Sequence, residues 1–439
     1  MRRPARLRRA LIEARYSLWF EPTLIMVAAV ALGLLLPWVD RSLPVSLQRS
    51  DSWARWVAIS AGGARATLAT SATALATILA ISVTATMVVI QLAAASYTAR
   101  LLRRFLGDRP IRLVLGLFTG SVLYLVMILG AVRSGTEGPE FVPVVSVLLS
   151  RALTIVCLGT LIVFVHHTAR SVQAGTVVSR LAGDALPYFR ALEAGRPAPA
   201  APLPAAPPTS DAFVITSQAT GYVQVVAEDQ LLAALPSQAR SVRVDASPGR
   251  FLLPGAPLVS LWSGDGGAVP APGDEAQERI REAFATGRQR TSDEDPSFAV
   301  RQLVDVALKA LSPAVNDPTT AVMVLNELAV IAHHATRTAC LGGWTATVRG
   351  ERLLWRWRFG LRDVLDGLTE VTDAGRGQAR VLVRALEVLE VLGGATAEPT
   401  AQRVLRDAAA HVVEMTEHGA LARAQHAELT RLFERWRDL

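Results

Sequence analysis

The sequence predicts an α-helical membrane protein with four transmembrane helices, followed by a small β module and an α-helical domain. Four apolar runs, each long enough to cross a bilayer, lie within the first 165 residues. The mean hydropathy of the 439-residue chain is +0.32, although the chain from Ala198 onward has the composition of a soluble protein. A polytopic membrane protein with a large extramembrane C-terminal half accounts for both observations.

The four predicted spans each hold about 22 residues or more, which at about 1.5 Å per residue covers a hydrocarbon core of about 30 Å. They run from Leu18 to Val39, Leu68 to Ala95, Ile111 to Val132 and Phe141 to Val165. We therefore expect residues 18–165 to form a four-helix transmembrane domain whose main partner is the lipid bilayer.

Arginine residues indicate the orientation of the spans. The basic N-terminus, residues 1–17, and the second connection, with Arg103 and Arg104, carry an excess of Arg, whereas Arg133 to Glu140 holds one Arg and two Glu. Because positive charge favours the cytoplasmic side, we expect a multi-pass protein with both termini in the cytoplasm. The first connection, Asp40 to Arg65, holds four Arg and argues mildly against this orientation.

Several function classes have little support. The net charge of +7 comes from basic residues beside the spans, so we expect no nucleic-acid partner. No catalytic spacing or paired-carboxylate motif stands out, so enzymatic function is not expected, and neither is a cofactor. The His pairs are adjacent in sequence and point to different faces, so we expect no metal site. Tryptophans and arginines between Trp344 and Arg358 are expected to cover a core or an oligomer contact.

Beyond the membrane, the chain changes composition several times. We expect a membrane-exit helix, an Ala/Pro-rich linker, a small β module and a helical cytoplasmic domain. Their predicted bounds are 166–192, 193–212, 213–262 and 274–439.

The β module resembles the barrel-sandwich fold of biotinyl and lipoyl carriers. One strand opens at Gly221-Tyr-Val, and a Gly-Ala-Pro-Leu turn ending at Leu258 leads into another. Such carriers need a lysine at the tip of the hairpin, and this segment has none. We therefore expect a structural or docking module.

Three motifs indicate a family. They are Ser-Leu-Trp-Phe-Glu-Pro at 17–22, the run Gln-Leu-Ala-Ala-Ala-Ser-Tyr-Thr-Ala-Arg from Gln91, and Phe164-Val-His-His. With the segments 287–305 and 310–321, they make the chain resemble, over nearly its whole length, a bacterial membrane-protein family known as domain of unknown function 2254. The resemblance implies an integral inner-membrane protein and assigns no activity.

The segment from Gly287 to Ala321 contains the candidate cytoplasmic site. Asp317-Pro318 is typical of a helix start, since the carboxylate caps the first turn and proline fits there. A helix N-terminus also attracts anions, so the arginines upstream could complete a site for a small anionic ligand. Alternatively, those arginines pair with nearby carboxylates and the motif is only a cap. The candidate residues are Arg288, Arg290, Arg301, Asp305, Ser312, Asn316, Asp317, Thr319 and Thr320.

The second span carries a polar stripe. Thr70, Thr77, Thr84 and Gln91 recur every seven residues and therefore follow one side of a helix. Small and hydroxylated residues allow close packing of membrane helices, which is the structural interpretation. The functional interpretation is a polar path, such as one around the axis of a homo-oligomer.

Arg151 lies inside the fourth apolar run, about 15 Å from its outer end, close to the expected midplane. A charged side chain at this depth should face a partner, a cavity or water. Alternatively, the side chain snorkels outward.

Together these features predict an oligomeric channel or transporter for a small ion or solute, regulated by its cytoplasmic domain. The alternative is a membrane-anchored sensor or scaffold, in which the spans serve only for anchoring and oligomerisation.

Overall fold

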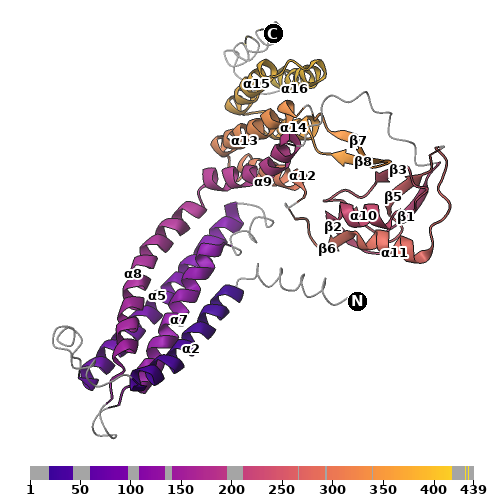
Figure 1. Ribbon diagram of the computed structural model, residues 1–439. Helices are drawn as coiled ribbons and strands as arrows, with labels where there is room; N and C mark the ends of the chain where they lie inside the picture. Colours follow the sequence, from indigo (N-terminus) through magenta and orange to yellow (C-terminus); the bar gives the residue numbers. More distant parts are fainter. Residues whose placement is uncertain are drawn as a thin grey trace. The chain divides into compact units, whose positions relative to one another are not determined.

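The computed structural model describes residues 19–42, 60–96, 108–133, 141–194, 211–264, 266–291, 294–338 and 340–417, with 431 and 434 (Figure 1). The basic N-terminus, most of the connections between spans and most of the predicted linker lie outside these residues. The chain divides into two compact units, Met1–Gln173 and Ala174–Leu439.

Among its described residues, the N-terminal unit contains four helices that are long and apolar enough to cross a membrane, as the sequence predicts. They are α2 (Phe20–Ser42), α5 (Ala61–Ser96), α7 (Arg109–Ala131) and α8 (Val144–Ser171). Helix α7 packs against the other three and buries 44% of its apolar window, compared with 17–22% for the others.

The interior of this bundle is filled by large side chains. Phe118, Tyr124 and Leu125 of α7 are almost fully buried, and they pack with Leu68 and Leu75 of α5. The buried positions of α7 follow a three- and four-residue spacing, which places them on the faces that contact the neighbouring helices.

The helix ends differ from the expected span bounds, most of all in α5, which begins at Ala61 rather than Leu68, and in α8. Helix α8 begins at Val144 rather than Phe141 and continues to Ser171, six residues beyond the predicted exit at Val165. After Val172 and Gln173, helix α9 (Ala174–Ala194) begins the C-terminal unit. The predicted exit helix therefore consists of the last turns of α8 and a separate helix.

In the part of the C-terminal unit that the structure describes, eight strands form two sheets, with the orders β1-β5-β3-β8-β7 and β4-β2-β6. The strands are β1 (Phe213–Thr216), β2 (Gly221–Val226), β3 (Ser241–Val244), β4 (Phe251–Leu252), β5 (Pro257–Trp262), β6 (Phe284–Gly287), β7 (Gly343–Arg349) and β8 (Arg352–Arg358). Three of them, β6, β7 and β8, come from the segment that the sequence predicts to be helical.

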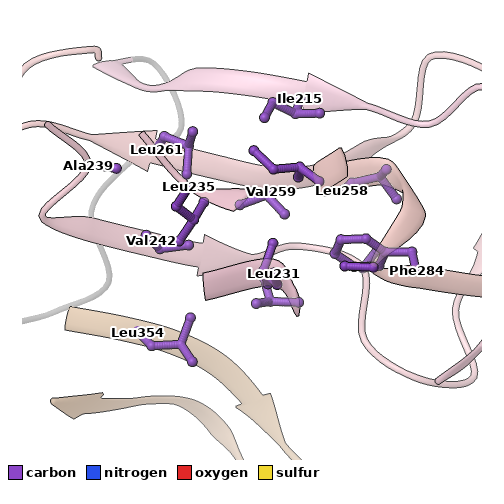
Figure 2. Packing of buried hydrophobic residues seen from close by; sticks show 14 of the residues in the cluster. Ile215, Leu231, Leu235, Ala239, Val242, Leu258, Val259, Leu261, Phe284 and Leu354 are labelled. Carbon is purple, nitrogen blue, oxygen red and sulfur yellow. The ribbon is translucent and has the colours of Figure 1, made fainter. Parts of the chain in front are cut away.

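One apolar core joins strands that are far apart in the sequence (Figure 2). Strand β8 pairs with β3 in parallel, with Leu354 opposite Val242, and both side chains are fully buried. The short helix α10 (Glu228–Ala234) adds Leu231 to the same core. The barrel-sandwich resemblance of residues 213–262 stays a prediction.

The remaining helices of this unit are amphipathic. They are α11 (Asp274–Glu282), α12 (Pro296–Ala310), α13 (Pro318–Arg337), α14 (Leu361–Ala374), α15 (Ala379–Gly394) and α16 (Pro399–Glu417). Helix α9 packs against α12 and α13, and Phe189 of α9 is fully buried beside the ring of Phe359.

Candidate functional site

At one end of the membrane bundle, Asp40 of α2 caps α8. Its carboxylate is 1% exposed and accepts hydrogen bonds from the N–H groups of Val145 (2.9 Å) and Ser146 (3.1 Å) and from the Ser146 hydroxyl (2.7 Å). A helix N-terminus has unpaired N–H groups and a partial positive charge, so a carboxylate stabilises it. This contact could not be predicted from the sequence, because the two partners lie more than 100 residues apart.

At the same end of the bundle, a cationic side chain of α5 lies at the C-terminus of α7. The Arg65 guanidinium of α5 donates to the carbonyl oxygen of Val132, the C-terminal cap of α7, at 2.8 and 3.3 Å. The buried Tyr124 hydroxyl donates to the Ser146 carbonyl at 3.0 Å. The Asp40 carboxylate therefore lies at a helix N-terminus and the Arg65 guanidinium at a helix C-terminus, and each charge stabilises the helix end that it contacts.

At the opposite end, close contacts between ionisable side chains connect three helices. Glu21 at the start of α2 lies 3.5 Å from Arg109 and 3.7 Å from the buried Arg112, both in the first turn of α7. Asp108, which precedes α7, lies 2.8 Å from the ring nitrogen Nε2 of His167 on α8. Glu21 and His167 both come from motifs that carry the family resemblance.

The spacing of these two polar ends fits a bilayer. The 23 residues of α7 extend about 34 Å, and Glu21 is about 28 Å from Asp40 along α2. A hydrocarbon core is about 30 Å thick. The charged groups at the two ends therefore bracket an apolar layer of the correct thickness.

The predicted polar stripe lies on the outer side of α5. Thr70, Thr77, Thr84 and Gln91 are all exposed, whereas α5 turns Leu68 and Leu75 toward the bundle. Each Thr hydroxyl donates to the carbonyl oxygen four residues earlier in α5, at 2.9–3.0 Å. The oxygen lone pairs of these hydroxyls remain available on the exposed face.

The half of the stripe with Thr70 and Thr77 belongs to a wider surface of small side chains, which we call the α5 face, whereas large apolar residues such as Met87 and Leu92 are exposed near Thr84 and Gln91. Within the described segment 61–80, every exposed residue is Gly, Ala or Thr. They are Gly62, Ala66, Thr67, Ala69, Thr70, Thr73, Ala74, Ala76, Thr77 and Ala80. Helix α8 instead exposes large apolar residues such as Ile155, Ile162 and Val163, as expected for contact with lipid.

Arg151 is nearer to one end of the membrane layer than the sequence predicts. Because α8 starts at Val144, Arg151 lies about 10 Å into the helix, at a depth similar to that of Thr70 in the parallel helix α5. The side chain is half-buried. Among the described residues, none forms a hydrogen bond or an ion pair with its guanidinium.

In the C-terminal unit, most of the predicted anion-site residues pair with one another. Arg290 lies 2.6 Å from Asp295, the N-cap of α12, and donates to Ser297. Arg301 binds Asp305 (2.8 Å) and Glu370 (2.6 Å), and the hydrogen bond with Glu370 is the main reason why its pKa is raised. Arg288 is exposed.

The helix start at Asp317 has the geometry of a cap. Its carboxylate accepts from the N–H groups of Thr319 and Thr320, both at 3.1 Å, and from the Thr320 hydroxyl at 2.5 Å. The hydroxyl contact with Thr320 holds the pKa of Asp317 below its ordinary value.

The two remaining candidates of this segment also make local contacts. Asn316 has a left-handed φ of 49° and accepts from Gln378 at 3.0 Å, and Ser312 donates to the carbonyl oxygen of Lys309. All these contacts fit the alternative in which the arginines pair with nearby carboxylates and the Asp317 motif is only a helix cap. An anion site in this segment stays a prediction.

Comparisons with known proteins agree with the membrane architecture. The family model described as "Predicted membrane protein (DUF2254)" matches residues 15–391. Uncharacterized protein Rv1290c of Mycobacterium tuberculosis and uncharacterized protein Mb1321c of Mycobacterium bovis are each 28% identical to the chain over 359 residues, which cover 81% of this chain and 68% of each relative. No solved structure matches the chain.

Proposed function

Since the chain belongs to the DUF2254 family of predicted membrane proteins, we propose that it forms an oligomeric channel for small ions, with the α5 face directed toward the path. The observation that carries this proposal is the exposure of Thr70, Thr77 and Thr84 on α5, away from the bundle. A polar stripe that faces hydrocarbon gains nothing there, whereas one that faces a second copy or water is solvated.

The path lies between copies rather than within one protomer. Phe118, Tyr124 and Leu125 fill the interior of the bundle, so the protomer itself is a packed core. Small side chains on the α5 face allow helices of neighbouring copies to approach closely. Threonine hydroxyls that turn away from the helix carbonyls and donate outward would then replace part of the hydration shell of a passing anion.

We expect the path to favour anions. Arg151 lies within the apolar layer at a depth similar to that of Thr70, and Arg65 lies at the nearer end of the bundle. Positive charge near a narrow path attracts anions and repels cations.

The orientation and regulation of this channel belong to the same proposal. Excess Arg in residues 1–17 and in the second connection supports cytoplasmic termini in a bacterial inner membrane. The C-terminal unit, including its barrel-sandwich-like part, then lies in the cytoplasm and regulates the path.

Ion flux into liposomes that contain the purified full-length protein tests the proposal. We expect chloride flux that exceeds potassium and sodium flux, and Arg151→Gln should reduce it or shift the selectivity while expression and assembly stay intact. Folded wild-type protein that passes none of the three ions would favour the alternative function, a membrane-anchored sensor or scaffold.

A further inference from the structure

The C-terminal unit contains a cavity of about 790 Å³ between α9, the β7–β8 hairpin and residues at the ends of β2 and β3. Cavities that hold small organic ligands have volumes of about 300–1,000 Å³. No residue of the predicted anion site lines this cavity. Other side chains therefore determine which ligands this cavity can bind.

The β7–β8 hairpin directs three guanidinium groups to one face. In its register, Arg349 lies opposite Arg352, and Thr345 lies opposite Arg356. Alternate residues of a strand share a face, so Arg349, Arg356 and Arg358 point to the same side of the hairpin. All three line the cavity.

Two of these arginines are already paired. The carboxylate of Glu228 at the start of α10 binds both Arg349, at 3.1 Å, and Arg356. Glu294 also lines the cavity and accepts a hydrogen bond from the N–H of Val226 at 3.2 Å.

Arg358 differs from them. It is half-buried, and no carboxylate among the described residues pairs with it. The residue opposite it on β7 is Gly343, which has no side chain to cover the guanidinium. A partly buried cation without a counter-charge is unfavourable, and an anion that enters the cavity would relieve this cost.

The neighbours of Arg358 identify the wall that it faces. Burial raises the pKa of Tyr188 on α9 and of Cys340 above their ordinary values, and the positive charge of Arg358 partly offsets both shifts. Tyr188 also lines the cavity, as does Trp357, which is 48% exposed. The ring of Tyr188 therefore lies near the unpaired charge, whereas Trp357, next to Arg358 in β8, points to the other face of the hairpin and packs against Trp344.

We infer that this cavity binds a small organic anion, whose single carboxylate or phosphate group pairs with Arg358 while an apolar or aromatic part packs against Tyr188. The guanidinium fork matches the geometry of both oxyanion groups. Asp184 and Glu294 also line the cavity, so polyphosphates are disfavoured. This inference holds whether or not the protein conducts ions.

Binding can be tested on the full-length protein in detergent with benzoate and phenyl phosphate as probes and benzyl alcohol as the neutral control. At least one of the two anions should raise the thermal unfolding midpoint in a saturable way, and benzyl alcohol should not. The two anions together distinguish a carboxylate site from a phosphate site.

Two variants localise the binding. Arg358→Gln should weaken anion binding about 10-fold or more, since it removes a charge-assisted contact, and should leave the unliganded protein at least as stable as the wild type. Arg380→Gln changes an exposed arginine of α15 outside the cavity and should bind the anions as the wild type does. Thr347→Phe, on the same face of the hairpin as Arg358, should fill part of the cavity and weaken binding of both anions.

Three results would overturn the inference: wild-type protein that neither anion stabilises, a folded Arg358→Gln variant with wild-type affinity, or equal stabilisation by benzyl alcohol. If Arg358→Gln does not fold, Thr347→Phe still decides, because unchanged affinity in that variant excludes the cavity as the binding site.

Discussion

At the scale of single residues, the membrane bundle depends on charges placed at helix ends. Asp40 binds the first N–H groups of α8, and Arg65 binds the last carbonyl of α7. Both contacts cross between helices. In an apolar layer, backbone groups at a helix end have no water to bind, so such side chains replace the solvent.

Asp40→Ala should therefore destabilise the protein by about 2 kcal/mol, since it leaves buried N–H groups at Val145 and Ser146 unpaired. A lower thermal unfolding midpoint in detergent is the expected result. Ser42→Ala, at an exposed position two residues later in the same helix, is the matched control and should unfold as the wild type does. Equal midpoints for the two variants would contradict the capping role.

Asp317 predicts a dependence of stability on pH. Its hydrogen bond from Thr320 lowers its pKa in the folded state below the ordinary value of 3.8, so the ionised carboxylate stabilises the fold. This contribution is present above about pH 4 and is lost as the pH falls through the lowered pKa.

Asp317→Ala should lower the stability of the C-terminal unit by about 1 kcal/mol at neutral pH. The difference from the wild type should shrink as the pH falls below about 4, because the wild-type carboxylate is then protonated. Unfolding curves across this range measure the effect. A difference that does not change with pH would show that the charge of Asp317 contributes nothing.

At the scale of elements, α5 is distinct from the other spans. It exposes only Gly, Ala and Thr between residues 61 and 80, whereas α8 exposes Ile155 and Ile162. Small residues favour contact between helices, and large apolar ones favour contact with lipid. Helix α5 is therefore the span that we expect to meet another copy.

Disulfide cross-linking can test this contact. In a Cys157→Ala, Cys340→Ala background, Thr77→Cys should give covalent dimers in membranes under mild oxidation, because two α5 faces lie together. Val163→Cys, on the exposed side of α8, is the control and should stay monomeric. Dimers that form only from Val163→Cys would show that α8, rather than α5, forms the contact between copies.

The elements also show what could be predicted from the sequence. Long apolar runs identify the four spans, since hydropathy alone decides them. The β7–β8 hairpin was missed, although Gly350, at a φ of 61°, separates a run with Trp, Thr and Val from a run with Leu and Trp. That pattern is a hairpin signal and could have revealed it.

The candidate sites were less predictable. The stripe at Thr70, Thr77 and Thr84 follows directly from a period of seven. The contact of Asp40 with α8 and the cavity position of Arg358 do not, because each depends on pairing between distant segments. Local sequence patterns carry no information about such pairs.

At the scale of the whole molecule, the Arg bias predicts a topology. Thr136→Cys, in the third connection, should react with an impermeant thiol reagent in intact cells. Ala200→Cys, in the predicted linker, should react only after the membrane is permeabilised. Both positions lie outside the described residues, so labelling is the direct measurement. The opposite labelling pattern would place the C-terminal unit outside the cytoplasm.

In the proposed channel, ions pass along the α5 faces of an oligomer. The most direct test is chloride flux into liposomes for wild-type protein, Thr77→Phe and the lipid-facing control Val163→Phe. Thr77→Phe should abolish the flux by filling a narrow path, while Val163→Phe should conduct as the wild type does. Unchanged flux through a folded Thr77→Phe variant, or no flux through the wild type, would contradict the proposed channel.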